Sequence, residues 1–164
     1  MKRFPPPTCV SWGRDEVPVS EYISQFPGTS DFRLILRPVI TIRIAGPKSE
    51  ARWDALVDTG ADETLLPLSL AELLGVERDR EATSLAAGIS GDKLTIHYGD
   101  VKLQIATGNE EITWRSTVGF VDFGGSDQEV IVLGHLGCLD FFTATFNGEL
   151  AELEMLPNSL LTVG

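Results

Sequence analysis

An alternation of apolar and polar positions runs through the middle of the chain and predicts β-strands. From Leu34 to Val57 the apolar positions recur every second residue, which is the period of a strand with one buried face. The two faces of the first strand are Ile40, Ile42 and Ile44 on one side and Val39, Thr41 and Arg43 on the other. A second apolar run, 53–57, follows the turn residues 46–49 and leads directly into Asp58. The pattern therefore predicts a β-hairpin that ends at an acidic residue.

The rest of the chain continues in the same way, with one helical interruption. Residues 68–74 have helical composition and precede Gly75, a natural helix terminator, so a short helix is predicted there. The further runs with strand character are Thr83–Ala86, Leu94–Tyr98, Val101–Ala106, Ile112–Val121 and Val130–Leu133. Residues 142–155 predict a hairpin, because Asn147-Gly148 supplies the two positive φ angles of a type I′ turn. No internal repeat is visible, so the sequence predicts one β-rich domain.

The two ends of the chain lack this periodicity. Residues 1–31 contain five prolines and are predicted to form an extended N-terminal arm. Three interpretations of the arm stay open: a removable pro-segment, a segment lying across a binding groove, or a plain extension. Residues 32–156 are predicted to form the folded domain, and residues 157–164 a C-terminal tail.

Composition and charge exclude several classes of protein. With 164 residues, 43% of them hydrophobic and 23% charged, the chain can form the core of one domain. The formal net charge of −11 disfavours nucleic acids and anionic membranes as partners. No apolar run approaches the roughly 20 residues of a membrane helix, and Pro5–Pro7 replace the apolar core of a signal peptide. We expect a cytoplasmic protein in which Cys9 and Cys138 are free thiols.

The most informative stretch follows the strand predicted at 53–57. Asp58-Thr59-Gly60 alone is a weak signal, which an ordinary turn would explain. It gains weight from its flanks, because 61–67, Ala-Asp-Glu-Thr-Leu-Leu-Pro, leads from it into the predicted helix. Two further segments come later in the chain: Ala86-Ala87-Gly88-Ile89-Ser90-Gly91 and Val130-Ile131-Val132-Leu133-Gly134.

These three segments, in this order, resemble the retroviral-type aspartic proteases, that is, the retropepsins and their cellular and bacterial relatives. The resemblance covers about residues 34–156. It implies an all-β, retropepsin-like fold with one short C-terminal helix and half of a catalytic site per chain. Asp58 would be the catalytic residue. Thr59 would form hydrogen bonds across a two-fold axis, and Gly60 would let two carboxylates come close.

The same resemblance assigns further residues to substrate binding. Ala61 and Asp62 would line the substrate groove, and Asp62 would form hydrogen bonds with the peptide backbone. Gly88, Ile89 and Ser90 would form the tip of a flap that closes over the substrate. Val132 would contribute to an apolar side-chain pocket. Since Ala61 replaces a hydroxyl that pepsin-like relatives often carry, we expect an activity optimum near about pH 5–6.

The chemistry requires two aspartates, and this chain supplies one. Hydrolysis of a peptide bond without a metal needs a carboxylate that takes a proton from water and a carboxylic acid that donates to the carbonyl. A homodimer with its two-fold axis between two copies of Asp58 supplies both groups. The sequence therefore predicts a homodimeric aspartic endopeptidase that acts on peptides or proteins. No cofactor is expected, and the two histidines have no metal-ligand spacing.

Two alternatives stay open beside the protease. The chain could be a catalytically silent module of the same fold that binds peptides or dimerises, or a monomeric β-protein with an accidental Asp-Thr-Gly. A departure from the family bears on this choice: retroviral enzymes usually carry arginine after the Leu-Gly pair, where this chain has His135. A contact between Asp62 and His135 would be strong in acid and weak at neutral pH, which predicts pH-dependent dimerisation. Otherwise His135 caps a helix or is simply exposed.

Overall fold

The computed structural model describes residues 37–78, 80–85, 93–107, 110–122, 130–150 and 152–161, together with three short strands at 8–11, 22–25 and 32–35. Its elements are β1 (Thr8–Ser11), β2 (Tyr22–Gln25), β3 (Phe32–Ile35), β4 (Val39–Ala45), β5 (Glu50–Val57), β6 (Leu65–Pro67), α1 (Leu68–Leu74), β7 (Arg80–Leu85), β8 (Lys93–Thr107), β9 (Glu110–Val121), β10 (Ile131–Leu133), the 3₁₀ turn η1 (Leu139–Phe141), β11 (Phe142–Asn147) and β12 (Glu152–Pro157). Strands dominate the described residues, so the prediction of a β-rich domain is confirmed.

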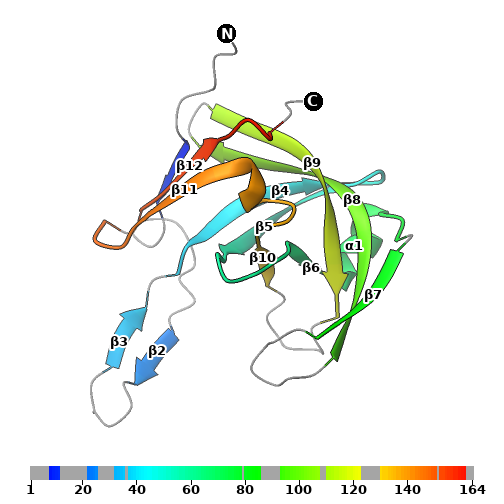
Figure 1. The fold of residues 1–164 in the computed structure, drawn as a ribbon, viewed down its shortest axis with the longest axis horizontal. Helices are drawn as coiled ribbons and strands as arrows, with labels where there is room; N and C mark the ends of the chain where they lie inside the picture. Colours follow the sequence, from blue (N-terminus) through cyan, green and yellow to red (C-terminus); the bar gives the residue numbers. More distant parts are fainter. Residues whose placement is uncertain are drawn as a thin grey trace.

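Six strands close into a barrel, shown in Figure 1. Their order is β4-β5-β10-β6-β9-β8, and β8 also pairs with β4, which completes the ring. Strand β7 pairs with β8 and extends the sheet beyond the barrel. Strands β5 and β10 run parallel, as do β6 and β9, while the other neighbouring strands are antiparallel.

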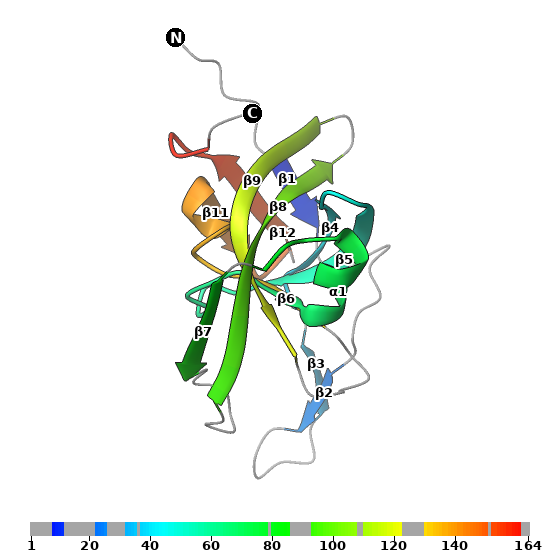
Figure 2. The same ribbon diagram turned by 90° about the vertical axis from the view of Figure 1, so that its right-hand side faces the viewer.

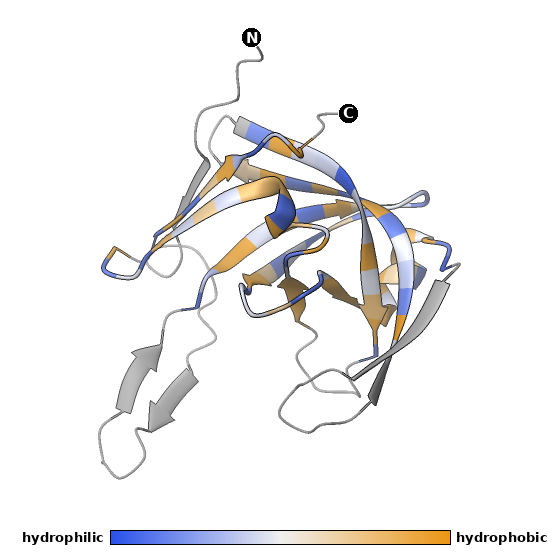
Figure 3. Ribbon diagram, in the orientation of Figure 1, coloured by the Kyte–Doolittle hydropathy of each residue, from blue (hydrophilic) through white to orange (hydrophobic). Residues whose placement is uncertain are grey.

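The barrel interior is the core that the alternation predicts. Ile40, Ile42 and Ile44, which form one face of the predicted strand, are at most 1% exposed in β4 and belong to the core. Burial of each such side chain contributes about 1.5–3 kcal/mol. Hydrophobic and hydrophilic residues alternate along β8 and β9 as well (Figure 3). The resulting core also contains Trp114, whose ring packs edge-on against Phe142 with centroids 5.2 Å apart.

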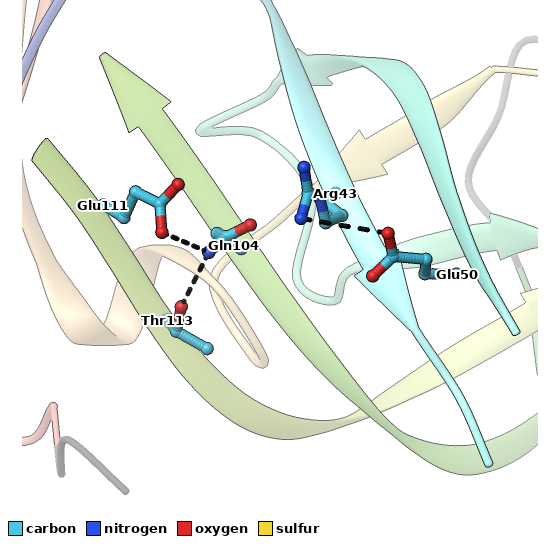
Figure 4. Close-up of polar contacts among 5 residues, drawn as sticks. All are labelled: Arg43, Glu50, Gln104, Glu111 and Thr113. Atoms are coloured by element: carbon cyan, nitrogen blue, oxygen red, sulfur yellow. Dashed lines mark hydrogen bonds and ion pairs between the residues drawn. The ribbon is translucent and has the colours of Figure 1, made fainter. Parts of the chain in front are cut away.

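Polar side chains cover the outer face of the same strands (Figure 4). Arg43 of β4 forms an ion pair with Glu50 of β5 at 3.8 Å. On β8, Gln104 donates its Nε2–H to Glu111 at 3.0 Å and to Thr113 at 3.3 Å, both on β9. These contacts join neighbouring strands on the solvent side, opposite the buried isoleucines.

Strand β8 joins two segments that the sequence analysis separated at Gly99-Asp100. It runs without a break from Lys93 to Thr107, so the predicted separation of the runs Leu94–Tyr98 and Val101–Ala106 is wrong. Gly99 is buried, and a Cβ there would lie 2.8 Å from the carbonyl oxygen of Glu77. The glycine therefore serves a close approach of two backbones and does not mark a turn.

The predicted helix is confirmed as α1, which has seven residues. Its apolar side chains Leu70, Ala71 and Leu74 are buried against the barrel. Gly75 ends it with φ 69°, the left-handed conformation that glycine adopts without strain. Within the described part of the chain, no helix is both long and apolar enough to span a membrane.

The short C-terminal helix implied by the resemblance is reduced to the single 3₁₀ turn η1. Between Gly134 and this turn stands Gly137, whose φ of 95° lies outside the helical region. The chain then enters β11 at Phe142. An α-helix has no continuous run of residues in which to form here.

The predicted C-terminal hairpin exists, but its turn differs from the expected type I′ turn. Strands β11 and β12 pair as far as Asn147 and Glu152, so the connection has four residues and not two. The Asn147 side chain organises this longer turn, because its Oδ1 accepts the backbone N–H groups of Glu149 and Leu150, each at 3.2 Å. Gly148 does not have the positive φ of a type I′ turn, and Asn147 instead organises the turn through its side chain.

A second sheet has the order β1-β12-β11 and contains residues from both ends of the chain. Strand β1 belongs to the predicted N-terminal arm and pairs antiparallel with β12, with Thr8 opposite Met155. Strands β2 and β3 form a separate two-stranded sheet. Part of the arm is therefore a strand of the fold, while the boundaries at 31–32 and 156–157 stay predictions.

Candidate active site

Asp58 lies where strand β5 ends, directly after the buried Val57. Its backbone N–H donates to the carbonyl of Leu133 at 3.1 Å, which continues the parallel pairing of β5 with β10. The residue is half-buried, so the core strands fix its backbone while its carboxylate reaches the surface. The local sequence explains this placement: an apolar strand brings the chain to the rim of the barrel, and a polar loop follows.

The Asp58 carboxylate is held by its own loop. The Gly60 N–H donates to Asp58 Oδ1 at 2.9 Å, and the Ala61 N–H donates to the Asp58 carbonyl at 3.2 Å. A Cβ on residue 60 would lie 3.2 Å from Oδ1, tighter than an ordinary contact. Glycine at this position therefore leaves room for the carboxylate that it binds. Thr59 and Gly60 are exposed, and Ala61 is half-buried beside them.

The segment 133–136 clamps this loop from the other side through backbone hydrogen bonds. The His135 N–H donates to the Ala61 carbonyl at 3.0 Å, and the Leu136 N–H donates to the Asp62 carbonyl at 2.9 Å. Gly134 passes so closely that a Cβ would lie 2.8 Å from the Ala61 carbonyl oxygen and still closer to that of Glu63. The glycine after Leu133 is therefore required by the approach of two backbones.

Thr64 is the one buried polar residue among those whose burial the structure describes. Its Oγ1 accepts the Gly134 N–H at 3.2 Å, and its carbonyl accepts the Gly119 N–H at 3.0 Å. The side chain thus joins the end of the Asp58 loop to the segment 133–136. The sequence analysis gave Thr64 no role, although a threonine directly before the apolar Leu65-Leu66 was the available signal.

His135 lies near the Asp58 loop, but its partner is not the predicted one. Its ring nitrogen Nε2 is 3.1 Å from the Thr59 carbonyl oxygen, to which it donates when that nitrogen carries a proton. The predicted contact with Asp62 is absent: the Asp62 side chain is exposed and forms no ion pair within the described part of the chain. The backbone bond to Ala61 fixes His135, and from there the imidazole reaches back to Thr59.

Glu63 and Tyr98 form a side-chain contact that the sequence analysis missed. The Tyr98 hydroxyl donates to Glu63 Oε2 at 2.7 Å. Partial burial and then the neighbouring Glu63 carboxylate raise the pKa of Tyr98 to about 12. The phenol is therefore a neutral donor throughout the range in which a protein is normally assayed. The two residues are 35 positions apart, and no motif connects them.

The remaining predicted residues are placed unevenly. Val132 lies half-exposed on β10, with Leu56 of β5 and Leu65 of β6 as its neighbours in the sheet. The proposed flap tip, Gly88 to Ser90, lies outside the described residues. The strands on either side of it are described: β7 and β8 pair antiparallel, from Leu85 opposite Lys93 to Arg80 opposite Tyr98.

The described residues provide no metal site, since no three His, Cys, Asp or Glu side chains among them gather closely enough to hold an ion. Cys138 is a free, buried thiol next to the clamp. Burial and then the charge of Asp140 raise the pKa of Cys138 to about 12, so the thiol is protonated and unreactive. The exposed polar residues of this region are Thr59, Asp62 and His135.

Comparison with known proteins covers this same region. A family model described as aspartyl protease matches residues 40–135, more than half of the chain. Among solved structures, the chain is similar to the EIAV protease complexed with the inhibitor HBY-793. The two share 23% sequence identity over 60% of this chain and 82% of that one, with a TM-score of 0.38. The family match begins in β4 and ends at His135, so it contains the Asp58 loop and residues 133–135 of the clamp.

Proposed function

Because this chain belongs to the aspartyl protease family and has its retropepsin-like, all-β fold, we propose that it is an endopeptidase whose catalytic dyad forms between two copies of Asp58 in a homodimer. One observation carries the proposal. The Asp58 carboxylate sits at the end of a buried strand, is bound by its own loop, and has no second acidic side chain bonded to it among the described residues. Thr59 and Gly60, next to it, are exposed and accessible to a second copy.

In the proposed mechanism the two Asp58 carboxyl groups share one proton, because two like charges at close range do not both ionise. The ionised group takes a proton from a water molecule as the water oxygen attacks the peptide carbonyl carbon. The protonated group donates to the carbonyl oxygen. The proton then passes to the amide nitrogen as the carbon–nitrogen bond breaks, which yields an acid and an amine.

The surroundings of Asp58 suit a peptide groove. Ala61 and the exposed Asp62 continue the loop beyond the carboxylate, and Val132 lies half-exposed on the adjacent β10. In this proposal Gly88, Ile89 and Ser90, between β7 and β8, form the tip of the flap. In this proposal Asp62 binds the substrate backbone, and Val132 contributes to a side-chain pocket.

The first experiment compares cleavage of an unstructured protein by the wild type and Asp58→Asn between pH 4 and 7.5. We expect a loss of at least about a hundredfold in the variant, because asparagine provides no proton-accepting carboxylate. Asp54→Asn is the matched control, because Asp54 lies on β5, the strand that leads into Asp58. The side-chain oxygen of the asparagine can still accept the hydrogen bond from the Thr41 hydroxyl, which is 2.7 Å long in the wild type. Equal cleavage by wild type and Asp58→Asn would overturn the assignment. Silence of all three in the presence of a dimer would favour the non-catalytic module.

A mixing experiment tests whether two chains share one site. Wild type and Asp58→Asn are mixed in equal amounts, allowed to exchange, and assayed at constant total protein. If each dimer needs two intact Asp58 residues, random pairing leaves about one quarter of the wild-type activity. If each chain works alone, about one half remains, and the shared dyad is wrong.

A further inference from the structure

The β7–β8 hairpin extends away from the barrel (Figure 2). Tyr98 lies at its base, where it pairs with Arg80, the first residue of β7. Residues 93–98 of β8 pair with β7, and beyond Tyr98 the strand pairs only with barrel strands. The next residue, Gly99, is packed against the backbone of Glu77. Tyr98 is therefore the last β8 residue shared by hairpin and barrel.

The partner of Tyr98 belongs to the most constrained part of the site. Glu63 forms a parallel β-bridge with Leu136, and its carbonyl faces the glycine of the clamp. It follows Asp62 directly and precedes the buried Thr64. A bond to the Glu63 side chain is thus a bond to the frame that holds Asp58.

We propose that the Tyr98–Glu63 hydrogen bond is a tether that sets the orientation of the β7–β8 hairpin relative to the Asp58 loop, so that both are positioning residues for substrate binding. The contact length of 2.7 Å is that of a strong bond between a hydroxyl and a carboxylate. The role in binding rests on the proposed function, whereas the tether itself does not.

Geometry explains why this one contact matters. Residues 96–98 of β8 still pair with β9 as well as with β7, and beyond Ile96 the hairpin is a two-stranded ribbon. Such ribbons have little stability of their own. Its orientation therefore depends on contacts at its base. Because the Tyr98 hydroxyl and the Glu63 carboxylate meet there, the bond restrains the hairpin at the point where it leaves the barrel. A hairpin oriented before substrate arrives lowers the cost of binding and leaves the chemical step unchanged.

Hydrogen exchange tests the tether without any need for catalysis. In Tyr98→Phe, we expect backbone amides of 80–85 and 93–98 to exchange about 5–10-fold faster, while the barrel strands are unchanged. Thr117→Val is the matched control, because it removes a different side-chain bond of β8, the 2.6 Å contact from Thr117 of β9 to Asp100, which lies outside the hairpin. Unchanged hairpin exchange, or equal acceleration throughout the barrel, would overturn the tether.

Steady-state cleavage tests the positioning role. We expect Tyr98→Phe to raise KM about 5–10-fold with kcat within about twofold of wild type. Glu63→Gln keeps an acceptor oxygen and should have a smaller effect, and Tyr98→Phe with Glu63→Gln should match Tyr98→Phe alone. A fall in kcat at constant KM would refute positioning. If wild type cleaves nothing while hairpin exchange responds as expected, the tether stands and the proposed function fails.

Discussion

Thr64→Val removes a buried hydrogen bond at the centre of the site while nearly preserving the shape of the side chain. The Thr64 side chain is 0% exposed, and its Oγ1 accepts the Gly134 N–H at 3.2 Å. Valine offers no acceptor, so the N–H of the clamp is left buried and unpaired. We therefore expect the segment 133–136 to be held less firmly where it faces the Asp58 loop.

The magnitude follows from two opposing contributions. An unpaired buried N–H costs about 1–3 kcal/mol, and the added methyl group returns about 0.8 kcal/mol of apolar burial. The expected net loss is about 0.2–2.2 kcal/mol in the free energy of unfolding. For a chain of this length that corresponds to a fall in melting temperature of about 0.4–9 °C.

The assay is urea unfolding of wild type, Thr64→Val and Thr64→Ser at one fixed protein concentration, since dimerisation would couple stability to concentration. Serine keeps the hydroxyl and loses only a methyl group, so it separates the hydrogen bond from packing. Exchange of the Gly134 amide should accelerate in Thr64→Val and stay slow in Thr64→Ser. A valine variant of wild-type stability with a protected Gly134 amide would refute the reasoning.

Three further predictions concern other parts of the fold. Gly134→Ala forces a Cβ into the facing backbone, so we expect a loss of at least about 1–3 kcal/mol and of cleavage, whereas Gly148→Ala, with open space around it, should leave thermal unfolding unchanged. Lys102 and Arg115 are direct cross-strand partners of like charge. Because Arg115→Glu replaces this repulsion by an attraction, it should raise the free energy of unfolding by about 0.2–1 kcal/mol in low salt. A gain that persists in high salt would contradict an electrostatic origin. Burial and then the charge of Asp140 raise the pKa of the Cys138 thiol from 9.0 to about 12. The contribution of the buried thiol to the free energy of unfolding is therefore complete below pH 9 and is lost as the pH rises towards 12. Urea unfolding against pH should show a shallower decline over this range in Cys138→Ala.

Elements with strong local signals were predictable from sequence. The buried face of β4 follows from a period of two, and α1 follows from a short apolar run that ends at Gly75. The position of Asp58 at the end of a buried strand follows from the same pattern. Each of these depends on neighbours within a few residues, which is the range over which periodicity and capping act.

Contacts between distant segments were not predictable in this way. The partner of His135 is the Thr59 carbonyl and not Asp62, because the backbone path of the clamp decides where the imidazole points. Tyr98 and Glu63 meet only after the barrel closes. Gly99 resembles a turn residue in sequence, yet serves a close backbone approach within a continuous strand. Such features depend on three-dimensional packing, which one sequence does not encode as a local pattern.

The clamp also has a consequence for the order of events in folding. The Asp58 loop is held by residues 133–136, and the hydrogen bond between Thr64 and Gly134 spans 70 positions of sequence. Contacts at this separation form late, because a long loop must close before they stabilise anything. A nascent chain that has not yet produced Gly134 cannot form the hydrogen bonds that hold the Asp58 loop in place. The Asp58 loop therefore reaches its final geometry only after most of the polypeptide has been synthesised.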